Sequence, residues 1–221
     1  YMYHKLFLIV FIHLLISPFA FASEDVCQSK GDSLYCSAGE VSSIFHMGNT
    51  ILSGTHVLHS VRVLGDLDAH KADMENLTLM GKVNMTLSVV RGGLDVTGEC
   101  ESHQSNFQEN AKITGNLRSN HDSFQHDVTM TGDLRVKDSE FKSIVDVTGS
   151  IQADGSVFDD ALNVQSCLIE FSQVKTKQII IKNDRNCTAN TQSIYLKNRT
   201  EVSGNIHFVG GNGKVFISKD S

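Results

Sequence analysis

The sequence has almost no proline, no tryptophan and few aromatic residues. Its 221 residues include a single proline, Pro18, and only 7% of them are aromatic. Since Pro18 lies in an apolar N-terminal stretch, the remaining chain contains no residue that lacks the backbone N–H donor of a β-ladder. The length suits one large domain or two small ones.

Charge and hydrophobicity exclude further classes of protein. Charged residues make up 20% of the chain, hydrophobic residues 40%, and the net charge is −6. This balance is unlike that of a disordered tail, and its acidic sign argues against a nucleic-acid binder. There is only one long apolar run, which argues against a polytopic membrane protein.

That apolar run, in residues 1–22, has the features of a secretory signal peptide. A short basic region precedes an apolar core, and Ala20-Phe21-Ala22 matches the small-x-small cleavage site. The alternative is an uncleaved anchor, but the apolar core is shorter than the roughly 20 residues of a membrane span. We therefore expect cleavage between Ala22 and Ser23, export to the periplasm, cell surface or medium, and no transmembrane span after cleavage.

Export permits disulfide bonds, and the chain has five cysteines. Cys27 and Cys36 enclose a short loop with a Lys-Gly-Asp turn, which favours a disulfide-closed hairpin. A metal-binding pair is the alternative, but no second ligand pair with usable spacing follows. The sequence therefore predicts a small N-terminal cap in residues 23–40.

A repeat of seventeen residues organises the rest of the chain. Around each repeated glycine, apolar residues alternate with polar ones at positions two and four before it and two after it. This period of two indicates strands, and seventeen residues are too few for a pair of helices. The glycines in one column are Gly81, Gly98, Gly115, Gly132 and Gly149.

A second column, nine residues after the glycine, holds four of the eight phenylalanines that follow residue 22. Its members are Val90, Phe107, Phe124, Phe141 and Phe158. Turns of seventeen residues, stacked in parallel, would bring these side chains into one internal aromatic stack. The sequence thus predicts an all-β, single-stranded right-handed β-solenoid of about eight to ten turns over residues 41–221.

The solenoid also predicts the state of the other cysteines. Cys100 stands in an apolar column, so we expect a buried free thiol. Cys167 and Cys187 lie about one turn apart, at a spacing that suits a disulfide bond across an irregular stretch.

A threonine column precedes the glycines and invites comparison with ice-binding solenoids. It consists of Thr97, Thr114, Thr131 and Thr148. Such proteins present two parallel threonine columns, whereas the neighbouring column here is charged and irregular: Asp95, Lys112, Thr129 and Asp146. We interpret the column as a β-branched ladder that favours strands.

Catalytic and metal sites have weaker support in the sequence. The eight histidines beyond residue 22 share no column, so we read them as surface residues. A carbohydrate-active enzyme would need paired carboxylates in a cleft walled by long loops, for which the regular period leaves little room. The local carboxylate pairs are Asp159-Asp160, Asp66/Asp68 and Glu99/Glu101. We predict no catalytic residue, cofactor or metal.

Four sequons are present, and the sequence leaves open whether any of them is glycosylated. Their asparagines are Asn76, Asn84, Asn186 and Asn198.

The glycine-centred V-x-G-x-L units from about Val61 to Ile206, followed by a glycine-rich ending up to Val215, resemble the bactofilins. These are bacterial polymer-forming cytoskeletal proteins. The resemblance implies a right-handed β-helix that assembles end to end into filaments without nucleotide. The signal peptide and the cysteine-closed cap are additions to the pattern of that mostly cytosolic family.

We therefore expect an exported, non-enzymatic β-solenoid that acts as a structural, polymer-forming or scaffold protein. Its Lys214-Val-Phe-Ile217 segment carries no proline to protect a terminal strand edge, so this edge could either recruit another copy or be closed by Lys219 and Asp220. One alternative is an adhesin or secreted module that binds a glycan, a protein or the cell envelope. The other is a carbohydrate-active enzyme.

Overall fold

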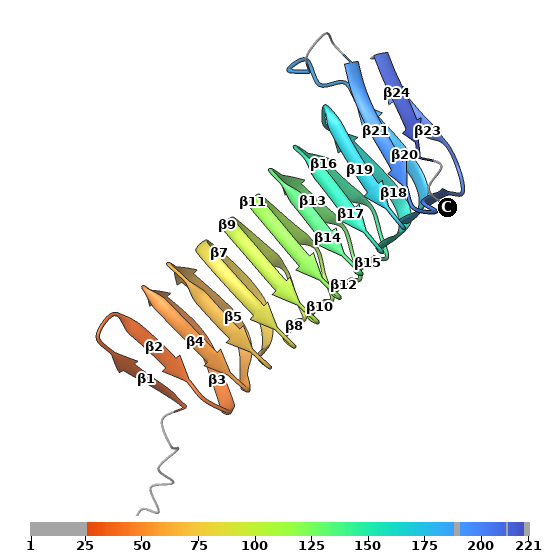
Figure 1. Cartoon of the computed structure of the whole chain (residues 1–221). Coiled ribbons are helices and arrows are strands. Elements are labelled where there is room, and N and C mark those ends of the chain that lie inside the picture. The colour runs from red at the N-terminus through yellow and green to blue at the C-terminus, as the bar shows by residue number, and fades with distance from the viewer. Residues whose placement is uncertain (1–25, 188–190, 211, 219–221) are drawn as a thin grey trace, which may run out of the picture.

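The structure is a computed structural model that describes residues 26–187, 191–210 and 212–218, and these form a parallel β-solenoid of about 11 turns (Figure 1). The predicted signal peptide and its cleavage site between Ala22 and Ser23 lie outside the described residues. The described residues contain strands and turns but no helix. They therefore include no helix long and apolar enough to cross a membrane. Their strands form one continuous sheet that winds around the rod.

Each turn has three faces. In the middle of the rod, β11 (Ala111–Asn120) bends at Gly115 and so contributes to two faces. We call the stack of residues before the glycine column face B and the stack after it face C. The short strand β12 (Ser123–Phe124) belongs to the third stack, face A.

The longest stack is face C, to which eleven strands contribute. It runs through β2 (Ser33–Cys36), β4 (Asn49–Ser53), β6 (Leu67–His70), β7 (Asp73–Thr86), β9 (Leu94–His103), β11, β14 (Leu134–Lys137), β17 (Ile151–Asp154), β19 (Leu168–Ser172), β21 (Thr191–Lys197) and β24 (Asn212–Ile217). All neighbours in this stack are parallel. The parallel stack thus begins at β2, inside the segment expected to be a cap, and this accounts for more turns than the expected eight to ten.

Face B combines long strands near the N-terminus with shorter ones later in the chain. It runs through β3 (Gly39–Met47), β5 (Thr55–Leu64), β7, β9, β11, β13 (Val128–Thr131), β16 (Val145–Thr148), β18 (Val157–Gln165), β20 (Lys175–Lys182) and β23 (Ile206–Val209). Face A uses the first residues of β3, β5, β7, β18 and β20, together with β8 (Val89–Val90), β10 (Asn106–Phe107), β12, β15 (Glu140–Phe141) and β22 (Glu201–Val202).

The glycine column allows the turns to stack at the bend between faces B and C. Gly98 and Gly115 are partners in the parallel ladder, and Gly115 has φ +133°. A Cβ atom on Gly115 would lie 1.9 Å from the carbonyl oxygen of Gly98. Only glycine therefore fits both the conformation and the close approach of the preceding turn.

Apolar residues fill the interior of the solenoid. Val90, Phe107, Phe124, Phe141 and Phe158 are each at most 1% exposed. Successive phenylalanine rings in this column are parallel, with centroids 4.5, 4.7 and 4.8 Å apart. These spacings follow that of the strands, because each ring comes from the same position of successive turns.

An extra residue between Gln165 and Ile169 shifts the inward column of face C. Ile151 pairs with Ile169 rather than with Leu168, whose side chain is 45% exposed. The seventeen-residue period predicts that Leu168, seventeen residues after Ile151, points inward. That prediction is wrong, because a one-residue shift exchanges the two sides of a strand. In the same region Phe171 of β19 extends the aromatic stack, with its ring centroid 6.2 Å from that of Phe158.

A ladder of buried hydroxyl groups supports the bend between faces C and A. The backbone N–H of Ser88 donates to Ser105 Oγ at 3.2 Å, and that of Ser139 donates to Ser156 Oγ at 3.2 Å. Each hydroxyl also donates to a carbonyl two residues before it, as Ser139 does to Lys137. Both hydrogen-bonding functions of these buried hydroxyls are thus satisfied.

Asp122 occupies one step of this ladder and is 3% exposed. Its carboxylate accepts hydrogen bonds from the N–H of Ser105 at 2.8 Å, from Ser119 Oγ at 2.7 Å and from the N–H of Asn120 at 3.1 Å. Burial raises the pKa of Asp122, and these donors oppose the rise.

Two disulfide bonds join the predicted cysteine pairs. Cys27–Cys36 connects β1 (Cys27–Lys30) to β2, with which β1 pairs in the antiparallel sense. Cys167–Cys187 joins the two sides of the irregular stretch. Cys100 is a buried free thiol, and burial raises its pKa.

Candidate functional site

An open groove of about 880 Å³ follows face C across seven strands, from β7 to β21. Its lining includes inward-facing residues with small side chains, Ser102, Ser119 and Ala153. On a strand, the residues between them point outward, so that polar and charged side chains border the groove. The groove is a property of several stacked turns, and no single repeat contains it.

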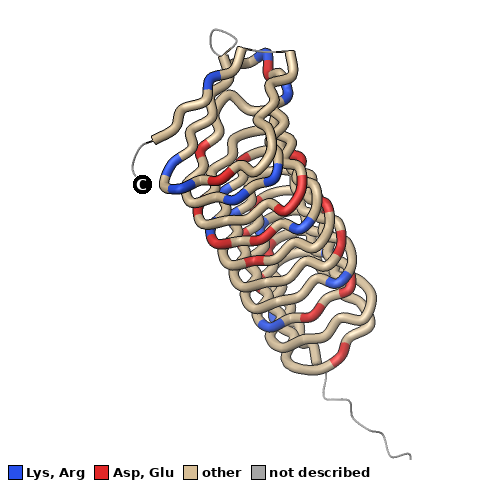
Figure 2. The backbone as a smooth tube through the Cα atoms, turned by 90° about the vertical axis from the view of Figure 1, so that its right-hand side faces the viewer, with Lys and Arg blue, Asp and Glu red and all other residues tan. Residues whose placement is uncertain are grey.

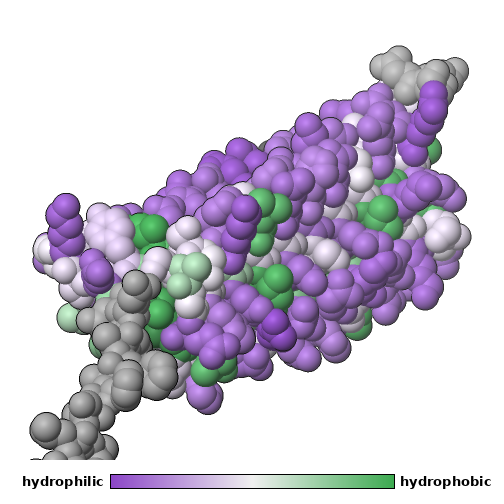
Figure 3. Space-filling model, turned by 90° about the horizontal axis from the view of Figure 1, so that it is seen from below, coloured by the Kyte–Doolittle hydropathy of each residue, from purple (hydrophilic) through white to green (hydrophobic). Residues whose placement is uncertain are grey.

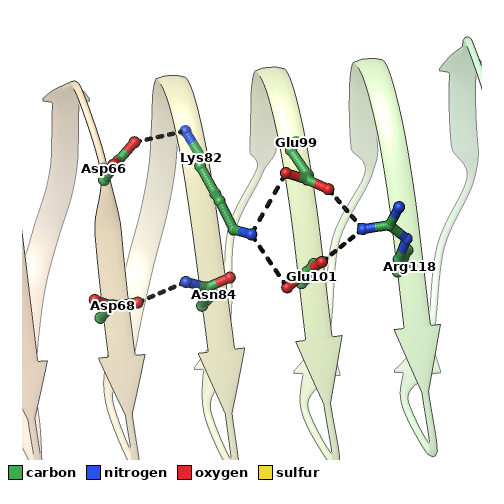
Figure 4. Close-up of polar contacts among 7 residues, drawn as sticks. All are labelled: Asp66, Asp68, Lys82, Asn84, Glu99, Glu101 and Arg118. Atoms are coloured by element: carbon green, nitrogen blue, oxygen red, sulfur yellow. Dashed lines mark hydrogen bonds and ion pairs between the residues drawn. The ribbon is translucent and has the colours of Figure 1, made fainter.

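Charged side chains form a network at the N-terminal part of the groove (Figure 4). Lys82 Nζ lies 3.4 Å from a carboxylate oxygen of Glu99 and 3.4 Å from one of Glu101. Arg118 Nη1 donates to the same two carboxylates at 2.7 Å. The hydrogen bond from Arg118 and the nearby Lys82 hold the pKa of Glu101 below its usual value.

The neighbouring aspartates are also engaged. Asp66 Oδ1 accepts a hydrogen bond from the backbone N–H of Lys82 at 3.3 Å, and Asp68 Oδ1 accepts one from the Asn84 amide at 2.7 Å (Figure 4). Glu99 and Glu101 are thus held between two cations, whereas Asp66 and Asp68 each accept a hydrogen bond from β7.

The third carboxylate pair lies on another side of the rod. Asp159 Oδ2 accepts a hydrogen bond from Lys142 Nζ at 3.0 Å, and Asp160 Oδ1 accepts one from the backbone N–H of Ala161 at 2.8 Å. The three predicted pairs are therefore not brought together into one cleft.

At the C-terminal part of the groove, Glu170 accepts hydrogen bonds from Gln152 at 2.7 Å and from Lys197 at 3.3 Å. These donors lower the pKa of Glu170. Between the two ends, Arg135 and Lys137 of β14 have exposed side chains. Within the described residues, neither of these two side chains takes part in a hydrogen bond or an ion pair.

The expectation that the histidines share no column is wrong for one pair, because His70 and His103 occupy one column with Thr86 between them. Among the described histidines, a ring contact joins two. The rings of His103 and His121 meet edge to face, with centroids 5.8 Å apart, and His121 Nε2 lies 3.7 Å from Asp138. Among described residues, the one trio of potential metal ligands with sufficiently close atoms is Cys167, Asp184 and Cys187. The sulfurs of this trio are joined in the disulfide bond, and zinc binding requires thiolates.

The threonine column continues toward the N-terminus as an apolar one, which sequence reasoning overlooked. Thr97 pairs with Met80, and the column goes on through Leu64 to Met47. These three apolar side chains are 60%, 46% and 65% exposed, and neighbouring Phe45 is 70% exposed. The register that aligns the glycines, with one step of sixteen residues between Leu64 and Met80, would have revealed this column.

The sequon asparagines differ in their surroundings. The Asn76 side chain donates to the carbonyl of His59 and accepts from the N–H of Gly93, and Asn84 is bound to Asp68. Asn186 follows Asp184 in the irregular stretch, and its N–H donates to that carboxylate. Asn198 is exposed in a turn with φ +50°.

The C-terminal turn leaves core positions uncovered. Val215 and Ile217 of β24 stand in register with Ile194 and Leu196, which are 0% and 8% exposed. By contrast, Val215 is 42% exposed and Ile217 75%. Within the described residues, no strand pairs with the outer edge of β24.

The remaining surface is mixed. Lysine, arginine, aspartate and glutamate are distributed over the turns, with both signs interspersed (Figure 2). The side of the rod seen in Figure 3 is mostly hydrophilic, with small separate hydrophobic patches.

No protein-family model, curated protein or solved structure matches this chain. The fold thus defines its class, a parallel β-solenoid, and the resemblance to the bactofilins stays a prediction. Two disulfide bonds indicate an oxidising environment.

Proposed function

We propose that this protein is an exported, non-enzymatic structural protein that polymerises end to end. The observation that carries the proposal is the C-terminal turn, where Val215, Phe216 and Ile217 are 41–75% exposed on the outermost strand. Among the described residues no strand pairs with its outer edge, so backbone donors and acceptors stand there beside apolar side chains. Addition of another strand would satisfy both at once.

The two ends of the rod differ, and this favours a chain of copies over a closed pair. At the N-terminal end, β1 is antiparallel to the solenoid strands and exposes Gln28, Ser29 and Lys30. In the proposed filament, β24 of one copy pairs with the outer edge of β1 in the next copy. Such a head-to-tail contact is heterologous and leaves a free end for further addition.

Other features support the remaining parts of the proposal. The disulfide bonds favour an exported location, because they persist in oxidising compartments. The carboxylates of Glu99, Glu101 and Asp159 are held in ion pairs. An assembly role requires none of them for chemistry.

Electron microscopy and sedimentation of the chain starting at Ser23 test the proposal. We expect filaments for the natural sequence and single rods for Ile217→Lys, whose added charge would be desolvated in the contact. Met80→Lys is the matched control, because Met80 is 60% exposed on face B, on β7 between β5 and β9, and so lies away from both ends. This control should still form filaments.

The outcomes are distinct. Single rods of the natural sequence would contradict polymerisation, and pairs of twice the rod length would contradict the head-to-tail contact. Filaments that persist with Ile217→Lys would contradict the assigned end. Thermal unfolding of both variants shows whether the substitution has disturbed the solenoid instead.

A further inference from the structure

We infer that the groove on face C binds an acidic oligosaccharide, with carboxylate groups of uronic acid units on Arg135 and Lys137. This inference goes beyond end-to-end assembly and does not rest on it. It begins from the uneven pairing of charges along the groove. Lys82 and Arg118 at one end are neutralised by Glu99 and Glu101.

At the other end of the groove, Lys197 is paired with Glu170. Arg135 and Lys137 lie between these networks on β14, and both side chains are exposed. Within the part of the chain that the structure describes, they have no partner. The centre of the groove is therefore a place where an anionic group would meet two available cations.

The chemistry of Arg135 favours a carboxylate. Its planar guanidinium can donate two parallel hydrogen bonds to the two oxygens of such a group. Lys137, two residues along the same strand, lies on the same side of the sheet and would add a second charge-assisted contact. Solvent would compete at this open surface, so several contacts are needed for binding.

The polar residues around these cations suit the hydroxyl groups of a sugar chain. Asn120 and Gln152 lie on the strands to either side of β14, and Thr86 and Ser172 border the groove further along. Amide and hydroxyl side chains both donate and accept hydrogen bonds, as sugar hydroxyls do. The seven strands of the groove are separated by six intervals, so the groove is about 29 Å long along the rod.

The same lining disfavours a densely charged ligand. Glu101, Asp154 and Glu170 border the groove, and the whole chain carries a net charge of −6. A nucleic acid, with a phosphate on every unit, would meet these carboxylates and would need many more cations. Widely spaced carboxylates separated by neutral hydroxyls avoid that repulsion, and this favours a uronic acid chain.

Calorimetric titration with a purified hexamer of galacturonic acid tests the inference, and its fully methyl-esterified form serves as the neutral control ligand. We expect binding of the acid and at least tenfold weaker binding of the ester. The double variant Arg135→Gln/Lys137→Gln should also weaken binding at least tenfold. A tenfold loss of affinity is on the order of the loss of one charge-assisted hydrogen bond. Added salt should weaken it as well.

The matched control is Arg62→Gln/Lys112→Gln, which removes the same charge from the outward side of face B. This variant should bind within twofold of the natural sequence. All titrations are repeated in the Ile217→Lys background, so that failure of assembly and failure of binding are distinguished.

Three results would overturn the inference. They are no binding of the acid at millimolar concentration, equal binding of the ester, and equal loss in the control variant. Stronger binding of a sulfated oligosaccharide or of single-stranded DNA would overturn the assignment to uronic acids.

Discussion

At the scale of single residues, the solenoid depends on positions where one side chain type fits. Gly115 lies against the backbone of the preceding turn, and Phe124 lies between two other rings. Asp122 takes the place of a serine in a buried ladder. Each of these residues lies beside the equivalent residue of the turn before and the turn after. Those two neighbours determine which side chain fits.

Gly115→Ala should lower the free energy of unfolding by more than about 4 kcal/mol, because the new Cβ would meet a backbone oxygen at 1.9 Å. Urea denaturation measures the loss. Gly31→Ala is the control: Gly31 has φ +62° and open space around it, so we expect a loss of only about 1 kcal/mol. Equal losses would show that the close approach between turns is unimportant.

Asp122→Ser should stabilise the protein more at pH 7 than at pH 3. Burial raises the pKa of Asp122 in the folded chain above the ordinary value of 3.8, so the folded state holds its proton more tightly than the unfolded state. The contribution of Asp122 to stability is therefore greatest below pH 3.8 and declines as pH rises through the folded pKa.

Urea denaturation across this pH range measures the difference between the Asp122→Ser variant and the natural sequence. Asp95→Ser is the matched control, because Asp95 is exposed on face B. A difference for Asp122→Ser that does not change with pH would show that the buried carboxylate does not titrate as inferred.

At the scale of strands, alternation of apolar and polar residues determines which side chains fill the interior. Strands as short as β10 and β12, of two residues each, hold their place because both neighbours have the same register. The irregular stretch near residue 187 breaks this regularity, and a disulfide bond closes it. We therefore expect that bond to matter for stability.

Replacing Cys167 and Cys187 together by serine should lower the free energy of unfolding by about 3 kcal/mol, since the bond closes a loop with a sequence separation of 20. Guanidinium denaturation measures this loss. Thiol titration of the natural protein should detect Cys100 only after unfolding, because it is 0% exposed. Thiols that react in the folded protein would contradict the assigned pairing.

At the scale of the whole molecule, the repeat sets the length of the rod. Eleven strands stacked on face C, with intervals of about 4.8 Å, give a length of about 48 Å. The two ends carry different chemistry, polar at β1 and apolar at β24. The long sides carry the groove, so assembly at the ends would leave it accessible.

Small-angle X-ray scattering of the Ile217→Lys variant should give a single rod of about 50 Å. The natural sequence should give longer particles that grow with concentration. A compact globular profile for the variant would contradict the solenoid itself.

The sequence alone determines the stacking period, the glycine bends, the phenylalanine stack and the cysteine pairs. These features recur every seventeen residues, and in a parallel stack each residue lies beside its own copy. The contacts on face C could not be predicted in this way. They depend on which long side chains reach across neighbouring strands, and Asn84, Glu101 and Arg118 differ at equivalent positions.

Only the tertiary structure shows where the repeat departs from its period and what the departure exposes. The extra residue that turns Leu168 outward and Ile169 inward changes no composition pattern, because both side chains are apolar. The groove likewise arises from the combined outline of seven strands. The period of the strands can be read from the sequence, because it repeats along the chain. Which outward side chains contact one another depends instead on how each turn packs on the next.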